Sequence, residues 1–237
     1  MVDRKNDINF NAKSLWHGTS TVFLDSIRHH GLGAINIAKK YELIALLDHL
    51  YKETARLKIK HTGLENKRNS INTIISNGKM YHGKMELNYS YDGTFVSLSP
   101  IRASMYACTT SIGSELLDYC LFLLNLLLDY EPNIPEEVDL INIKQFLNVT
   151  AKPILIEVTT FTDDNLILED GSPAQQLLNE IRTEYPKLPI EEHFMRIQFS
   201  NFKLFNPIEP SVLNFYEVEY SGHPFGQDFK PKFIPIK

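Results

Sequence analysis

Hydrophobic residues along this chain occur at two different spacings, which together predict a mixture of helices and strands. Over residues 41–57, apolar side chains recur at helical spacing with charges between them. The strongest apolar run lies in a predicted helix near 115–130, and it is too short to span a bilayer. Residues 58–69 are polar and contain a glycine, which predicts an exposed connection.

Two serine–proline pairs and several β-rich runs complete the pattern. Serine at the cap and proline in the first turn predict one helix through residue 107 and another from 172 to about 181. Residues 79–91 predict a loop or a hairpin. Residues 165–168 are expected to continue the β-rich run 154–158 or to pair with it. That run and the other expected strands cover residues 94–98, 154–158, 194–205 and 213–220.

The first β-rich run, near the N-terminus, is followed by a turn and a short helix. Residues 15–20 read Leu-Trp-His-Gly-Thr-Ser, a strand that brings His17 and Gly18 to the turn. Ser20 is a suitable N-cap for the helix, and Gly31 is a suitable residue for its C-terminal end. Because glycine has no side chain, the backbone beside the histidine can approach a planar ligand closely.

This block resembles the first motif of the ADP-ribosyltransferase superfamily, in its diphtheria-toxin-like and poly(ADP-ribose)-polymerase-like branch. In that family a histidine is followed by glycine and then by threonine or serine, which corresponds here to His17, Gly18 and Thr19. The resemblance implies that His17 holds a ribose hydroxyl of NAD and that the Gly18 backbone binds the nicotinamide carboxamide. It also implies that Thr19 belongs to the NAD site.

Residues 93–107 resemble the second motif of the same family. There, an aromatic residue on a strand is followed eleven positions later by a tyrosine on a helix, as Phe95 is followed by Tyr106. The resemblance implies that the two rings clamp nicotinamide. A flat, cationic pyridinium is held well between aromatic faces by stacking and cation–π attraction.

A C-terminal segment resembles the strand that carries the third signature residue, a glutamate, but Asn201 stands at that position. Asparagine can hydrogen-bond a ribose hydroxyl but supplies no charge, and loss of one preorganised electrostatic group costs roughly 100- to 1000-fold in rate. Gln198 is the alternative polar position on the same predicted strand. Three carboxylates lie nearby in sequence, at Glu192, Glu217 and Glu219, and the alternation of the last two predicts a solvated strand face.

The resemblance implies an α+β fold with a split, mainly antiparallel sheet around an NAD cleft. One domain over 1–237, with an insert over about 34–92, is the economical interpretation because no repeat or linker interrupts the chain. The implied activity is mono-ADP-ribosylation, in which NAD is the substrate and nicotinamide is released. His17, Tyr106 and Asn201 would be catalytic, and Phe95 and Gln198 would join the residues that bind NAD.

Composition and charge restrict the partners of such an enzyme. The chain has 43% hydrophobic and 22% charged residues, as ordinary globular proteins do, and a net charge of −5 argues against a general nucleic-acid-binding surface. A macromolecular acceptor, protein rather than nucleic acid, is therefore expected. Two alternatives stay open: a catalytically silent NAD-binding or target-binding module, and an enzyme like the related RNA phosphotransferases.

Cellular location and metal content follow from simpler features. Cys108 and Cys120 form neither a zinc pattern nor a disulfide framework, and the histidines lack ligand spacing, so no metal is expected. The first nine residues are mostly polar and show no cleavable signal peptide. We therefore expect a cytoplasmic protein, or a toxin or effector that is delivered to a host cytoplasm, with no membrane span.

Overall fold

The computed structural model describes residues 13–76, 79–82, 85–88, 91, 93–131, 143–198 and 200–236. The chain folds as a mixture of helices and antiparallel strands, so the predicted α+β class is confirmed. It divides into two compact units. The first comprises Met1–Ile35, Gly93–Gly113 and Ala151–Lys237, and the second comprises Asn36–Asp92 and Ser114–Thr150.

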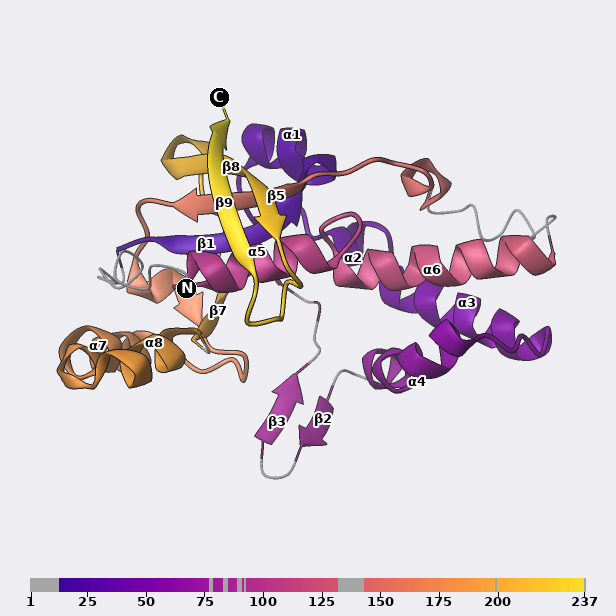
Figure 1. Cartoon of the computed structure of the whole chain (residues 1–237), viewed down its shortest axis with the longest axis horizontal. Coiled ribbons are helices and arrows are strands. Elements are labelled where there is room, and N and C mark those ends of the chain that lie inside the picture. The colour runs from indigo at the N-terminus through magenta and orange to yellow at the C-terminus, as the bar shows by residue number, and fades with distance from the viewer. Residues whose placement is uncertain are drawn as a thin grey trace. The chain divides into compact units, whose positions relative to one another are not determined.

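A seven-stranded antiparallel sheet forms the centre of the first unit (Figure 1). Its strands lie in the order β6-β7-β4-β1-β5-β8-β9. Strand β1 pairs with β5 along its whole length, because Leu15 lies opposite Val158 and Ser20 lies opposite Pro153. The strands are β1 (Leu15–Ser20), β4 (Phe95–Ser97), β5 (Pro153–Val158), β6 (Leu166–Ile167), β7 (Asn201–Leu204), β8 (Leu213–Ser221) and β9 (Lys230–Ile236).

Alternation along these strands gives the sheet two apolar faces. Leu15, Ile156 and Phe202 belong to the larger cluster, which also contains buried residues of the helices α1 (Thr21–His30), α7 (Gln175–Thr183) and α8 (Ile190–Gln198). On the other face, Leu155 packs in a smaller cluster with Ala103 of α5 (Pro100–Thr109). The described part of this unit also contains the short 3-10 helices η3 (Asp163–Asn165), η4 (Tyr185–Lys187) and η5 (Pro210–Val212).

The local signals for the ends of α1 and for the start of α5 are confirmed. The Ser20 hydroxyl accepts a hydrogen bond from the Val22 amide at the start of α1, and Gly31 ends that helix with a φ of 93°. Ser99 caps α5 in the same way through the amide of Arg102. These caps act within one turn of helix, so a sequence read without its fold can reveal them.

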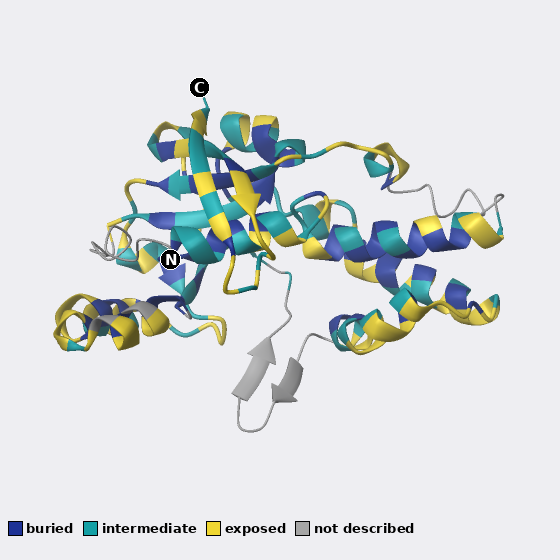
Figure 2. Ribbon diagram, in the orientation of Figure 1, coloured by how far each residue is buried: buried dark blue, intermediate teal, exposed yellow. Residues whose placement is uncertain are grey.

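The second unit is helical, with one hairpin. Among its described residues, the helices are α2 (Ile37–Lys40), α3 (Leu43–Arg56), α4 (Thr62–Ile75) and α6 (Glu115–Tyr130), a 3-10 helix is η2 (Ile143–Phe146), and the hairpin pairs β2 (Lys79–His82) with β3 (Met85–Asn88). The predictions of α3, α6 and the hairpin are confirmed. Figure 2 shows the long buried stripe of α6, where nine residues are buried. Within the described ranges, every helix is too short or too polar to cross a membrane.

Two predicted elements in the first unit are wrong in whole or in part. Residues 194–198 end α8 instead of beginning a strand: His193 and Ile197 are buried one turn apart, and Glu192 pairs with Arg196 at 2.7 Å. Of the residues described in the expected strand 194–205, Asn201–Leu204 form a strand. Strand β6 pairs with β7 and not with 154–158.

Further corrections concern a connection, a helix start and an edge strand. The polar segment 58–69 contains the first half of α4, which buries Leu64. Helix α7 begins at residue 175, later than the serine–proline pair suggested. Strand β9 was not predicted, since Pro231 and Pro235 interrupt its pattern, yet an edge strand tolerates proline.

Candidate functional site

The three segments that resemble family motifs form neighbouring strands of the first unit. Trp16 lies opposite Ser97, and Ser97 lies opposite Asn201, so one row of paired residues crosses β1, β4 and β7. Residues that pair directly across antiparallel strands project to the same face of a sheet. This row therefore gathers segments that are more than 70 residues apart in the chain.

The sheet loses its regular pairing beside this row. Among the described residues, the register between β1 and β4 consists of the single pair Trp16 and Ser97. One residue further along β1, the imidazole Nδ1 of His17 lies 2.8 Å from the carbonyl oxygen of Phe95. A side chain therefore makes the next polar contact between these two strands.

This contact fixes the chemical state of His17. A carbonyl oxygen only accepts hydrogen bonds, so Nδ1 must carry the proton that it donates to Phe95. Burial lowers the pKa of His17, and the backbone hydrogen bond opposes that shift only in part. The ring is neutral near pH 7 as a result, and its Nε2 is an acceptor.

Gly18 lets a helix approach the same strand. A Cβ atom at this position would stand 2.0 Å from the carbonyl oxygen of Ala103 and 2.9 Å from the amide nitrogen of Ala107, both in the backbone of α5. Glycine at position 18 therefore has a packing reason that is independent of any ligand. Thr19 is 2% exposed, so it offers almost no surface for binding.

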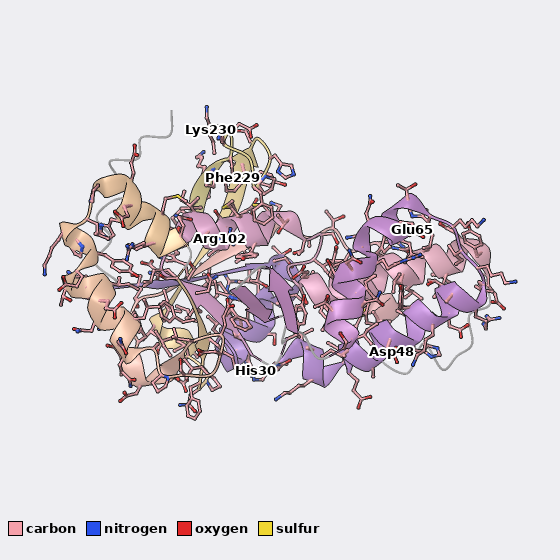
Figure 3. The ribbon with its side chains drawn as sticks, turned by 90° about the horizontal axis from the view of Figure 1, so that it is seen from below. His30, Asp48, Glu65, Arg102, Phe229 and Lys230 are labelled. Carbon is pink, nitrogen blue, oxygen red and sulfur yellow. The ribbon has the colours of Figure 1, made fainter. Side chains whose placement is uncertain are left out.

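Tyr106 lies on α5 and is 44% exposed. Its hydroxyl accepts a hydrogen bond from Nη2 of Arg102 at 2.9 Å, and the Arg102 guanidinium carbon lies 4.8 Å from the centre of its ring. Phe225, in the loop between β8 and β9, meets Tyr106 edge to face at 6.3 Å. Figure 3 labels Arg102 on this helix. The Tyr106 ring thus already contacts a planar cation.

Asn201 begins β7 and is partly exposed. Its side chain is hydrogen-bonded to the carboxylate of Glu169, which also lies within the electrostatic influence of Arg102. Although Glu169 is an exposed residue, its carboxyl group is shielded enough that burial raises its pKa, against the effects of Asn201 and Arg102. The structure therefore brings a carboxylate to the position where the sequence offers only an amide.

The alternatives to Asn201 lie elsewhere. Gln198 ends α8, is buried, and donates a hydrogen bond to the Ser99 hydroxyl, so the expectation that it shares a strand with Asn201 is wrong. Glu217 and Glu219 are on β8, which is separated from β7 by three strands. Glu192 is on α8, where it pairs with Arg196.

Sequence reasoning missed Glu169. This residue follows a strand of only two residues, and the sequence around it, an acidic pair before Gly171, is typical of an ordinary turn. Only the pairing of β6 with β7 connects it to Asn201. No local signal in the sequence could have revealed that connection.

The described residues include no group of three or more histidine, cysteine or acidic side chains that could hold a metal ion. Comparisons of the chain with protein-family models, curated proteins and solved structures found no match. The site therefore rests on its own geometry. Two sets of contacts are observed: the neutral imidazole of His17 contacts the carbonyl oxygen of Phe95, and Arg102 lies beside both the Tyr106 ring and the Glu169 carboxylate that bonds Asn201.

Proposed function

We propose that this chain is a mono-ADP-ribosyltransferase that transfers ADP-ribose from NAD to a macromolecular acceptor and releases nicotinamide. The observation that carries the proposal is the row of Trp16, Ser97 and Asn201, which makes neighbours of the three segments that resemble the family's motifs. A chance likeness of three separate segments gives no reason for them to meet in one sheet. The proposal includes an ADP-ribosyltransferase-like version of this antiparallel sheet.

In this proposal His17 and Gly18 hold one side of the substrate. The Nε2 acceptor of His17 takes a hydrogen bond from a ribose hydroxyl, and the fixed Nδ1 contact with Phe95 orients the ring for it. The Gly18 backbone binds the nicotinamide carboxamide. Backbone groups serve well here because packing against α5 holds them still.

Tyr106 and Phe95 hold the nicotinamide ring. The contact between Tyr106 and the Arg102 guanidinium supports this role, because a pyridinium is likewise a flat cation that an aromatic face attracts. Tyr106 is also exposed enough to receive a ligand. Bound NAD would replace Arg102 on the ring, or stack on the face that Arg102 leaves open.

The reaction breaks the bond between C1′ of the ribose and the nicotinamide nitrogen, and the electron pair leaves with nicotinamide. The acceptor then forms a new bond to C1′ and loses a proton. Asn201 orients the ribose while positive charge develops on the sugar, so that the bound substrate stays aligned for attack. The net charge of −5 favours a protein acceptor over a nucleic acid.

Nicotinamide release by the purified protein, with and without cell lysate, tests the proposal. We expect Tyr106→Ala to abolish release and to leave folding nearly unchanged, because this ring is 44% exposed. Tyr130→Ala is the matched control, since Tyr130 is 55% exposed on α6 of the second unit. His17→Ala should also abolish release, and stimulation by lysate would indicate an acceptor.

Two results would contradict this proposal. Full activity of Tyr106→Ala would defeat the assignment of the site. No release from a wild-type protein that NAD stabilises against heat would instead identify a binding module, the alternative that the missing signature glutamate favours. In that case the Tyr106→Ala variant should lose the stabilisation by NAD.

A further inference from the structure

We propose that Glu169 supplies the negative charge that Asn201 lacks, so that the two side chains together do the work of a single catalytic glutamate. This inference rests on the proposed function, because it assigns a role in stabilising the sugar as nicotinamide leaves. Glu169 comes from the turn after β6, a different element from the strand that carries Asn201.

The pairing of β6 with β7 places Glu169 beside Asn201. Leu166 lies opposite Leu204, and Ile167 lies opposite Lys203. This pairing ends two residues before Glu169 on one strand and two residues after Asn201 on the other, so the turn that follows β6 lies beside the start of β7. The hydrogen bond between the two side chains agrees with this register.

A tight turn holds Glu169 at this place. The amide of Gly171 donates to the carbonyl oxygen of Leu168 at 2.9 Å, and Gly171 has a φ of 87°, which suits glycine. Asp170 accepts a hydrogen bond from the Ser172 amide at 2.8 Å, and the Leu168 amide donates to the Ser172 carbonyl oxygen at 2.8 Å. The carboxylate is thus presented from a fixed loop.

The chemistry of the pair suits a ribose. An ionised carboxylate only accepts hydrogen bonds, so the Asn201 amide nitrogen must donate to Glu169. This bond fixes the orientation of the amide, and its oxygen becomes the group that accepts from a ribose hydroxyl. Glu169 then lies behind the amide as a carboxylate whose ionised form Asn201 and Arg102 favour, at the side of the sugar where positive charge develops.

Arg102 connects this pair to the ring of Tyr106. Its charge favours the ionised form of Glu169, while Nη2 donates to the Tyr106 hydroxyl at 2.9 Å. Four side chains from α5, β7 and the turn after β6 are therefore linked. In this arrangement the carboxylate and the nicotinamide-binding ring belong to one network.

The test is nicotinamide release by Glu169→Gln, which keeps the shape and removes the charge. We expect the rate to fall about 100- to 1000-fold, the loss typical of one electrostatic group, with NAD affinity by calorimetry changed less than threefold. Asp170→Asn is the matched control. It removes a charge from the neighbouring residue but keeps an oxygen that can accept from Ser172, and it should release nicotinamide at the wild-type rate.

A double variant separates lost charge from lost structure. Glu169→Gln combined with Asn201→Glu moves the carboxylate onto β7, and we expect it to recover at least tenfold of the lost rate. A double variant no faster than Glu169→Gln would overturn the inference, and so would a Glu169→Gln variant of wild-type activity. The second result would leave the proposed function standing if release still required Tyr106, whereas a wild-type chain that releases no nicotinamide would overturn both.

Discussion

Gly18→Ala should be the most damaging single methyl group that can be added to β1. The new Cβ would meet the Ala103 carbonyl oxygen at 2.0 Å, and Cβ atoms in proteins essentially never come within 3.0 Å of a neighbour. The backbones of β1 and α5 must therefore separate by about 1 Å, the difference between these distances. Six residue pairs hold β1 against β5, so we expect α5 to move.

The energetic cost follows from what α5 buries. Ala103 is 3% exposed and Ala107 is 1% exposed, so a displaced helix loosens close contacts along one face. Overpacking of this kind costs about 1–3 kcal/mol, and we expect about 3 kcal/mol because both obstacles are backbone atoms. For a protein of this size, that loss lowers the melting temperature by roughly 6–12 °C.

Thermal and urea unfolding of Gly18→Ala and Gly93→Ala measure this effect. Gly93 is the matched control, because the three atoms nearest to a Cβ added there all belong to the flexible side chain of Lys203. We expect Gly93→Ala to melt within about 3 °C of the wild type, which corresponds to about 1 kcal/mol. Equal melting temperatures for the two variants would refute close packing of α5 on β1.

Three further predictions concern titration, capping and thiol reactivity. Because burial lowers the pKa of His17, the contribution of this residue to stability is complete above pH 6.5 and is lost on acidification, at less than about 1.4 kcal/mol per pH unit. Urea unfolding at pH 7.5 and 5.5 should therefore show a smaller loss of stability in His17→Asn than in the wild type. Equal losses of stability in the two proteins would contradict this prediction. Ser20→Ala should lower the free energy of unfolding, measured in urea, by about 2 kcal/mol. The buried Ser20 hydroxyl caps α1 and donates a hydrogen bond to the Ile112 carbonyl oxygen at 2.6 Å. A loss below about 0.5 kcal/mol would argue against both hydrogen bonds. Cys120 is buried and Cys108 is partly buried, and this burial raises the pKa of both thiols, that of Cys108 to about 12. Mass spectrometry after iodoacetamide treatment at pH 8 should therefore find both thiols unlabelled in folded protein and labelled in urea, and rapid labelling of the folded protein would contradict the raised pKa values.

Several features of this protein could be read directly from its sequence. Ser20, Gly31 and Ser99 mark helix ends, because a cap satisfies backbone groups within the first or last turn. The helix Glu115–Tyr130 follows from its long apolar run, which only Asp118 and Asn125 interrupt between residues 116 and 128. The eleven-residue spacing from Phe95 to Tyr106 does correspond to a strand followed by a helix.

The signals that failed were local ones that favoured the wrong element. Residues 194–198 are rich in large apolar side chains, which suited a strand. The helical spacing of His193 and Ile197, together with the Glu192–Arg196 pair, indicates the correct structure. In this segment the spacing of residues along the chain indicates the secondary structure better than the apolar composition does.

The arrangement of the candidate site required the fold. Pairing between strands depends on hydrogen bonds between residues distant in the chain, and one sequence is compatible with many strand orders. The sequence therefore revealed His17, Tyr106 and Asn201 as separate candidates, but not that Asn201 lies opposite Ser97 or bonds to Glu169. Local periodicity and capping are encoded by neighbours in the chain, whereas the carboxylate beside Asn201 exists only because β6 and β7 pair.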